Sequence, residues 1–129
     1  MRRIRGSWQS VIVWALVILV ATSVPVTDLV LRMSLPWLDK VVHAALYGVL
    51  GWLVGAALVV SGRHSRWTFV LALVAIVAFA GADELHQHWL PGRVPMLSDW
   101  LADVVGATIG LSAGMMSLRR AVPGTADDA

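Results

Sequence analysis

The sequence predicts an all-α membrane protein with four transmembrane helices. Of its 129 residues, 58% are hydrophobic and 14% are charged, and this charged fraction is roughly half that of a typical soluble domain. The apolar residues gather in four stretches, and four of the seven tryptophans lie at or beside the ends of these stretches, as in interfacial aromatic belts. The absence of cysteine excludes disulfides and thiolate chemistry, and the scattered basic residues give no support to nucleic-acid binding.

The four stretches predict the transmembrane spans. A span needs about 20 residues at 1.5 Å per residue, and the third stretch reaches that length only if its helix continues through Glu84. That continuation places Glu84 at the membrane boundary. A single transmembrane domain is therefore expected over residues 1–120, with a disordered cytoplasmic tail at 121–129. The expected spans are about 8–24, 41–60, 67–86 and 99–118.

The first stretch has a second interpretation. Three arginines precede it, and Ala21-Thr22-Ser23 at its end resembles the small-x-small cleavage site of a signal peptide. The Pro25 that follows, and the need for an even number of spans to keep both basic ends on one side, favour a retained helix. Between the first two spans, residues 27–38 are too short and too mixed to cross, so a segment lying in the outer interface is expected there.

Lysine and arginine counts predict the orientation. With a cytoplasmic N-terminus, seven basic residues lie inside and three lie outside, so both termini are expected in the cytoplasm. Six of the eight carboxylates then lie at the outer face, where the polar groups gather. The inner basic residues are Arg2, Arg3, Arg5, Arg63, Arg66, Arg119 and Arg120, and the outer ones are Arg32, Lys40 and Arg93.

Glycines recur at helix-packing spacing in the second and fourth stretches. Small residues every three or four positions let membrane helices approach closely. In the second stretch, merely tolerated glycines are an equal alternative. The stripe in the fourth stretch predicts packing, either against the second helix of the same chain or across a homodimer. The two sets are Gly48, Gly51 and Gly55, and Gly106, Gly110 and Gly114.

Polar residues cluster at the outer ends of three spans. Asp39, His43 and Tyr47 are spaced i, i+4, i+8 and so share one helix face, as do Asp99 and Asp103 on the fourth helix. Three helices with polar faces at one depth predict a shared outward-facing pocket. Its expected ligand-binding residues are Asp39, Lys40, His43, Tyr47, Glu84, Gln87, Arg93, Asp99 and Asp103.

Ordinary explanations exist for parts of this cluster. Asp39 with Lys40, and Arg93 near Asp99, are equally well read as ion pairs at the membrane rim, which contribute under about 1 kcal/mol when exposed. Glu84 and His88 lie one turn apart and are the weak candidates for a divalent metal site. No His-Glu-x-x-His pattern accompanies them, so no cofactor is expected, with a bound divalent metal as the minor alternative.

These residues resemble the VanZ-like family of small bacterial integral membrane proteins. The similarity runs from about Pro36 to Gly110, and Asp103 stands where the family usually has asparagine. The resemblance implies a multi-pass protein of the bacterial inner (cell) membrane, related to a protein associated with resistance to the glycopeptide teicoplanin. The matching positions are Asp39-Lys40-Val41-Val42-His43, Tyr47, Leu50, Glu84-Leu85-His86-Gln87, Pro91-Gly92-Arg93, Asp99, Gly106 and Gly110.

Three functions are weighed. The leading hypothesis is binding of a membrane lipid or lipid-linked envelope precursor, with an effect on glycopeptide sensitivity. An intramembrane hydrolase or transferase acting on a lipid-linked phosphate or ester is the alternative, with His43 as base, Asp39 as its orienting partner and Glu84 as acid or metal ligand. A proton-coupled carrier ranks last because no acidic group is expected near mid-membrane.

Overall fold

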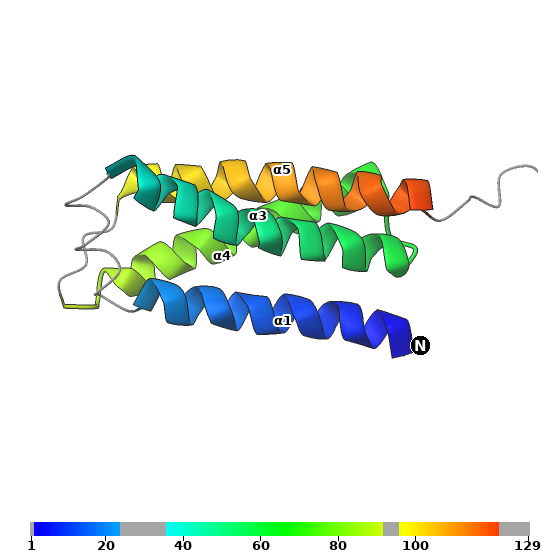
Figure 1. The fold of residues 1–129 in the computed structure, drawn as a ribbon, viewed down its shortest axis with the longest axis horizontal. Coiled ribbons are helices and arrows are strands. Elements are labelled where there is room, and N and C mark those ends of the chain that lie inside the picture. The colour runs from blue at the N-terminus through cyan, green and yellow to red at the C-terminus, as the bar shows by residue number, and fades with distance from the viewer. Residues whose placement is uncertain (1, 24–35, 92–95, 122–129) are drawn as a thin grey trace, which may run out of the picture.

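The computed structural model is a bundle of four α-helices (Figure 1). The structure describes residues 2–23, 36–91 and 96–121, with side chains described for 7–23, 37–91 and 96–119. The helices run alternately up and down, so the start of α1 and the end of α5 lie at the same end of the bundle. Their bounds are α1 Arg2–Ser23, α3 Pro36–Val60, α4 Arg66–Gln87 and α5 Leu97–Ala121.

Helices α3 and α5 pack closely along the glycine stripes. A Cβ added at Gly106 would overlap the Ala44 carbonyl oxygen, and one added at Gly110 would overlap the Gly48 carbonyl oxygen. Farther along the helices, a Cβ at Gly114 would overlap the backbone of Trp52. Backbone therefore lies against backbone, which only residues without a side chain permit. Of the two arrangements expected for this stripe, the structure contains the one within a single chain.

The connection between α3 and α4 is a tight turn. Gly62 has a φ of 70°, and the amides of Gly62 and Arg63 bond to the carbonyls of Val59 and Leu58 at 3.0 and 2.8 Å. This is a Schellman arrangement, which suits glycine because the left-handed conformation is costly for other residues. Ser65 then caps α4 by accepting a hydrogen bond from the Thr68 amide at 3.1 Å. The turn folds α4 back along α3.

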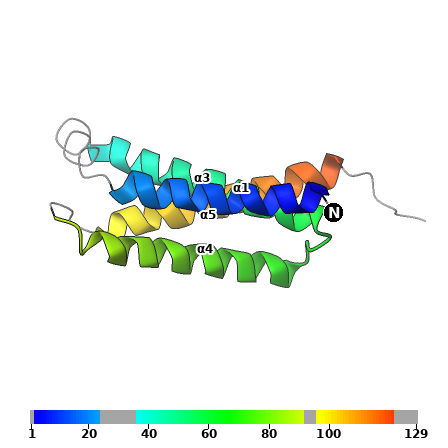
Figure 2. The same cartoon turned by 90° about the horizontal axis from the view of Figure 1, so that it is seen from below.

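Helix α1 joins the bundle through two tryptophans. The Trp14 indole donates to the Leu46 carbonyl at 2.9 Å, and the Trp8 indole donates to the Ser61 hydroxyl at 3.2 Å. Ile18 is fully buried in the core. Helix α1 packs mainly against α3 and to a lesser extent against α4 (Figure 1 and Figure 2). These contacts hold α1 against the rest of the bundle.

Three of the helices are long and apolar enough to cross a membrane. They are α3, α4 and α5, and their outward faces carry exposed apolar side chains such as Leu71 and Ile109. The apolar part of α1, Ser7–Ser23, is shorter, about 25 Å at 1.5 Å per residue against a hydrocarbon core of about 30 Å. The structure therefore shows three of the four predicted spans, while the fourth and the orientation of the termini stay predictions.

The predicted boundaries differ from the observed ones in one instructive place. Helix α3 begins at Pro36, five residues before the predicted second span, because proline is well tolerated in the first turn of a helix. Residues 36–38 of the expected interfacial segment are therefore helical. The rest of that segment, at 27–35, and the predicted tail beyond Ala121 lie outside the described residues.

Candidate functional site

Helix α3 presents three polar side chains on its buried face. Asp39, His43 and Tyr47 are 3%, 4% and 0% exposed. Their i, i+4, i+8 spacing aligns them along one stripe, and the glycines beside the stripe bring α5 close enough to face it. On α5, Asp99 and Asp103 are each 1% exposed. The end of the bundle where α3 and α5 begin therefore holds polar groups where a core normally holds apolar ones.

Lys40 joins the first carboxylates of the two helices. Its Nζ lies 3.2 Å from Asp39 Oδ2 and forms a short ion pair with Asp99 Oδ1. The lysine side chain is 30% exposed, whereas both carboxylates are buried. Lys40 therefore lies at the exposed edge of the polar cluster. The predicted ion pair of Asp39 with Lys40 is present, but its carboxylate is buried rather than exposed. The predicted pair of Asp99 with Arg93 stays a prediction, because Arg93 lies outside the described residues.

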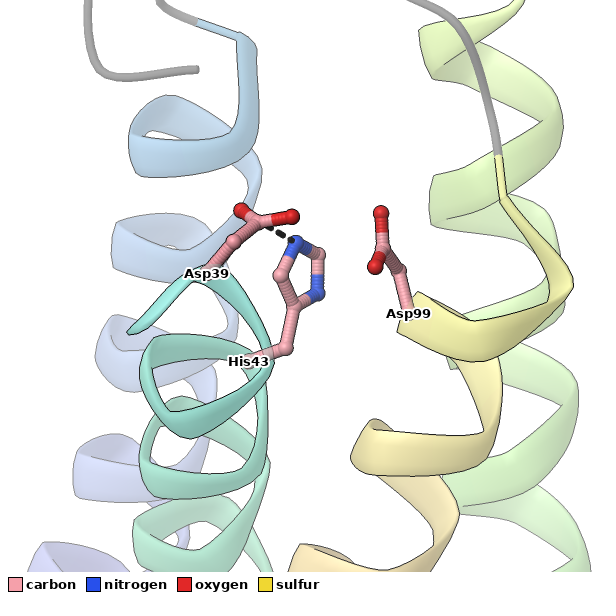
Figure 3. Close-up of side chains that lie close together, drawn as sticks. All are labelled: Asp39, His43 and Asp99. Atoms are coloured by element: carbon pink, nitrogen blue, oxygen red, sulfur yellow. Dashed lines mark ion pairs between the residues drawn. The ribbon is translucent and has the colours of Figure 1, made fainter. Parts of the chain in front are cut away.

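His43 stands between carboxylates from two helices. Its Nδ1 lies 3.0 Å from Asp103 Oδ1, and its Nε2 lies 4.0 Å from Asp39 Oδ1. Figure 3 shows the imidazole between Asp39 and Asp99, with the ion pair to Asp39 drawn as a dashed line. The closer contact is to Asp103, so that residue, rather than Asp39, is the stronger partner of the ring. Both ring nitrogens have a carboxylate to face.

Asp83 connects three helices and is absent from the set predicted by sequence. Its Oδ1 is hydrogen-bonded to the Thr22 hydroxyl of α1 at 2.9 Å, and its Oδ2 accepts from the Tyr47 hydroxyl of α3 at 3.3 Å. It is 1% exposed, and Gln87, one turn further along α4, is also buried. The signal that was available is the i, i+4 spacing of Asp83 and Gln87, which puts both on one helix face. The contribution of Thr22 has no counterpart in the sequence patterns.

Glu84 is buried beside Asp83 but faces a different neighbour. Asp83 points to α1 and α3, whereas the Glu84 carboxylate lies close to His43 and to Asp103 of α5. Glu84 is 8% exposed, and neither of its oxygens has a hydrogen-bond partner in the described part of the chain. The same holds for one oxygen of Asp103, Oδ2. Burying a carboxylate with no partner is costly, so Glu84 marks the chemically unusual point of the site.

Two predicted residues remain to be placed, His88 and Arg93. His88, the second weak candidate for a metal ligand, is exposed, as is His86. Arg93 lies outside the described residues, so its place relative to the cluster stays a prediction.

Within the described ranges, two groups of three side chains offer ligand atoms within 4.8 Å of one another. Both share His43, and all their members are buried. The first group adds Asp39 and Asp99, and the second adds Glu84 and Asp103. Nitrogen and oxygen ligands of this kind suit divalent metal ions. They also suit proton transfer, since an imidazole held by carboxylates is a common general base.

An apolar cavity lies between the helices, and none of its lining residues belongs to the polar cluster. It has a volume of about 420 Å³ and is lined by side chains of α1, α3 and α4. Phe79 forms part of its wall and lies against Tyr47, with ring centroids 6.1 Å apart. Tyr47 in turn bonds to Asp83. The Tyr47–Phe79 contact therefore lies between the cavity and the polar cluster.

Comparison with known proteins gives one family. A family model described as VanZ/LLP1 matches residues 3–118, which covers the four helices almost completely. No curated protein and no solved structure matches the chain.

Proposed function

The chain belongs to the VanZ/LLP1 family, and from that membership we propose that it binds a lipid-like or lipid-linked envelope ligand within the membrane. The observation that carries the proposal is an apolar cavity whose wall residue Phe79 contacts Tyr47, a member of the buried polar cluster. An amphiphile likewise consists of an apolar tail joined to a polar head. Its tail would occupy the cavity and its polar head would lie at the cluster.

The cavity has the size and lining expected for part of an acyl chain. A volume of about 420 Å³ lies in the range of small-molecule sites, which are often found between the helices of a bundle. Apolar side chains dominate the lining, among them Val11, Leu50, Val54, Ile76 and Phe79. Helix α4, which lines part of the cavity, is one of the three helices long enough to cross a membrane. Because acyl chains are the most abundant apolar molecules in a membrane, a lipid chain is the apolar ligand proposed for the cavity.

Lys40 supplies a cation for the polar head. It already contacts Asp39 and Asp99, yet an ammonium group has three donors and its side chain is 30% exposed. A phosphate or carboxylate on the ligand would use the remaining donor. Arg93, which follows Pro91-Gly92, is proposed as a second contact because arginine binds such groups in a bidentate manner.

The proposed setting is the bacterial inner membrane, with the polar cluster facing away from the cytoplasm. The distribution of basic residues supports that orientation. Phospholipids and lipid-linked wall precursors expose their heads on that side. Binding such a molecule would connect the protein to envelope composition and, through it, to teicoplanin sensitivity.

Native mass spectrometry of the protein extracted gently from its own membrane tests the proposal. We expect a co-purifying lipid on the wild type and its loss in Ala75→Phe, which places a ring in the cavity. The matched control is Ala78→Phe, on the same helix but lining a different depression near Trp100. A wild-type protein that carries no lipid, or equal lipid on both variants, would contradict the proposal.

Catalysis is the second candidate function, favoured by one observation. His43 is held at 3.0 Å by Asp103, with Glu84 beside it and without a partner among the described side chains. An imidazole and a carboxylate so placed suit general acid–base chemistry on a lipid-linked phosphate or ester. Turnover of such lipids by wild-type protein, lost in His43→Asn, would support this candidate, and absence of turnover with and without divalent metal would count against it.

A further inference from the structure

Glu84 is the starting point for a further inference about the polar cluster. Its carboxylate is more than nine-tenths buried, and both oxygens lack a hydrogen-bond partner in the described part of the chain. A buried carboxyl group without hydrogen-bond donors is rare, and it must either take up a proton or meet a compensating charge. The nearest ligand-bearing groups are His43 and Asp103, which come from the two adjacent helices. The unexplained oxygens therefore lie where three helices meet.

We infer that His43, Glu84 and Asp103 form a binding site for a divalent transition-metal ion such as Zn²⁺. Their ligand atoms lie within 4.8 Å of one another, and Asp103 Oδ2 shares with Glu84 the lack of a partner. Metal–ligand bonds of about 2.1 Å in tetrahedral geometry separate ligand atoms by roughly 3.4 Å. Small side-chain rotations suffice to reach that spacing, since His43 Nδ1 already lies 3.0 Å from Asp103 Oδ1.

The charges also favour this group over the other one. In the group formed with Asp39 and Asp99, the cation is already present, because Lys40 Nζ contacts both carboxylates. The group with Glu84 and Asp103 contains two carboxylates and one imidazole but no lysine or arginine. A divalent ion would balance the two carboxylates and leave a neutral site, which is the arrangement a membrane interior favours.

In this site, Asp39 is the carboxylate that would orient the His43 ring. Metal-binding histidines usually direct their second ring nitrogen toward a carboxylate, which holds the ring in position. With Nδ1 of His43 on the metal side, Nε2 faces Asp39 Oδ1 at 4.0 Å (Figure 3). Imidazole with carboxylates suits zinc and other first-row transition metals, and three protein ligands leave one position open. Occupation of that position by a ligand phosphate depends on the proposed lipid-binding function, whereas the metal site itself does not.

The test is zinc binding by purified, chelator-treated protein in detergent without added lipid. After equilibrium dialysis against zinc chloride, elemental analysis should find one zinc per wild-type chain. We expect Glu84→Gln to lower the affinity at least about 100-fold and Asp39→Asn to lower it about 10- to 100-fold, the range for loss of an orienting partner. Cobalt(II) offers a second readout, since its visible spectrum reports nitrogen and oxygen coordination.

Matched variants separate this site from its neighbours. Asp99→Asn removes a member of the other group and should keep its zinc. The double variant His86→Ala, His88→Ala removes two exposed histidines near Glu84 and so tests for adventitious binding, and it should also keep its zinc. Because the Glu84 side chain makes no hydrogen bond among the described residues, metal-free Glu84→Gln loses no such bond and should unfold at no lower a temperature than the metal-free wild type.

Two results would overturn the inference. One is less than stoichiometric zinc on the wild type. The other is zinc that persists in both Glu84→Gln and Asp103→Asn, or that disappears with the exposed histidines. The outcome is independent of the proposed function: a protein that binds zinc but no lipid refutes only the lipid proposal, and one that binds lipid but no zinc refutes only the metal site.

Discussion

The hydroxyl of Thr22 in α1 lies 2.9 Å from the Asp83 carboxylate in α4, so a hydrogen bond joins residues 61 positions apart at the polar end of the bundle. Both side chains are buried. This contact attaches the first helix, whose apolar part is shorter than a full span, to the cluster formed by the other three. It makes α1 a part of the site rather than only an anchor.

Replacing Thr22 with valine should destabilise the protein. The variant keeps the shape of the side chain but removes one partner of a buried carboxylate, which costs about 1–3 kcal/mol in the free energy of unfolding. Thr22→Ser is the control because it retains the hydroxyl. Denaturant titration in detergent measures the difference, and equal stability of valine and serine variants would contradict a structural role for the bond.

The Tyr47 hydroxyl contributes separately from its ring. In Tyr47→Phe the ring contact with Phe79 remains, but the 3.3 Å bond to Asp83 is lost. A loss of about 0.5–1.5 kcal/mol in the free energy of unfolding is expected, the typical net contribution of one hydrogen bond. A larger loss, comparable to Tyr47→Ala, would mean that the hydroxyl supports more of the cluster than this one bond.

Two glycine variants at the α3–α5 contact should differ sharply. Gly110→Ala places a Cβ into the Gly48 carbonyl oxygen, so the helices must move apart, at a cost of about 1–3 kcal/mol or more. Gly48→Ala in the same interface meets its nearest atom, the Gly106 carbonyl oxygen, at 3.5 Å, an ordinary contact, and should be tolerated. Thermal unfolding of both variants gives the comparison, and similar midpoints would contradict the observed packing.

Lys40 should be coupled energetically to Asp99. Lys40→Gln leaves two buried carboxylates without their shared cation and is expected to cost roughly 1–3 kcal/mol, less than a fully buried pair because the lysine is partly exposed. The double variant Lys40→Gln, Asp99→Asn should recover part of that loss. A double-mutant cycle measures the coupling, and strictly additive effects would show that the contact adds no stability.

Orientation can be measured directly because the chain contains no cysteine. Single cysteines at Ser98, near the polar end, and at His64, in the turn at the opposite end, are both exposed. With the predicted cytoplasmic termini, an impermeant maleimide added to intact cells should label Ser98→Cys and leave His64→Cys unlabelled until the cells are opened. The reverse pattern would invert the proposed orientation.

Much of the architecture was predictable because it depends on local patterns. Long apolar stretches predict helices, and i, i+4, i+8 spacing predicts that Asp39, His43 and Tyr47 share a face. The three are indeed buried together. The same reasoning left Asp83 out of the predicted site residues, because its contacts with Thr22 and Tyr47 come from other helices.

The sequence by itself determined the helical class, the polar end of the bundle and the small-residue stripes, since each follows from the order of residues along one helix. Only the tertiary structure decided which carboxylate meets which partner. Lys40 joins Asp39 to Asp99, His43 lies nearer Asp103 than Asp39, and the Glu84 carboxylate is left with no hydrogen bond among the described residues. These pairings depend on how closely and at what rotation the helices pack, and the glycine contacts between α3 and α5 set that distance through steric exclusion.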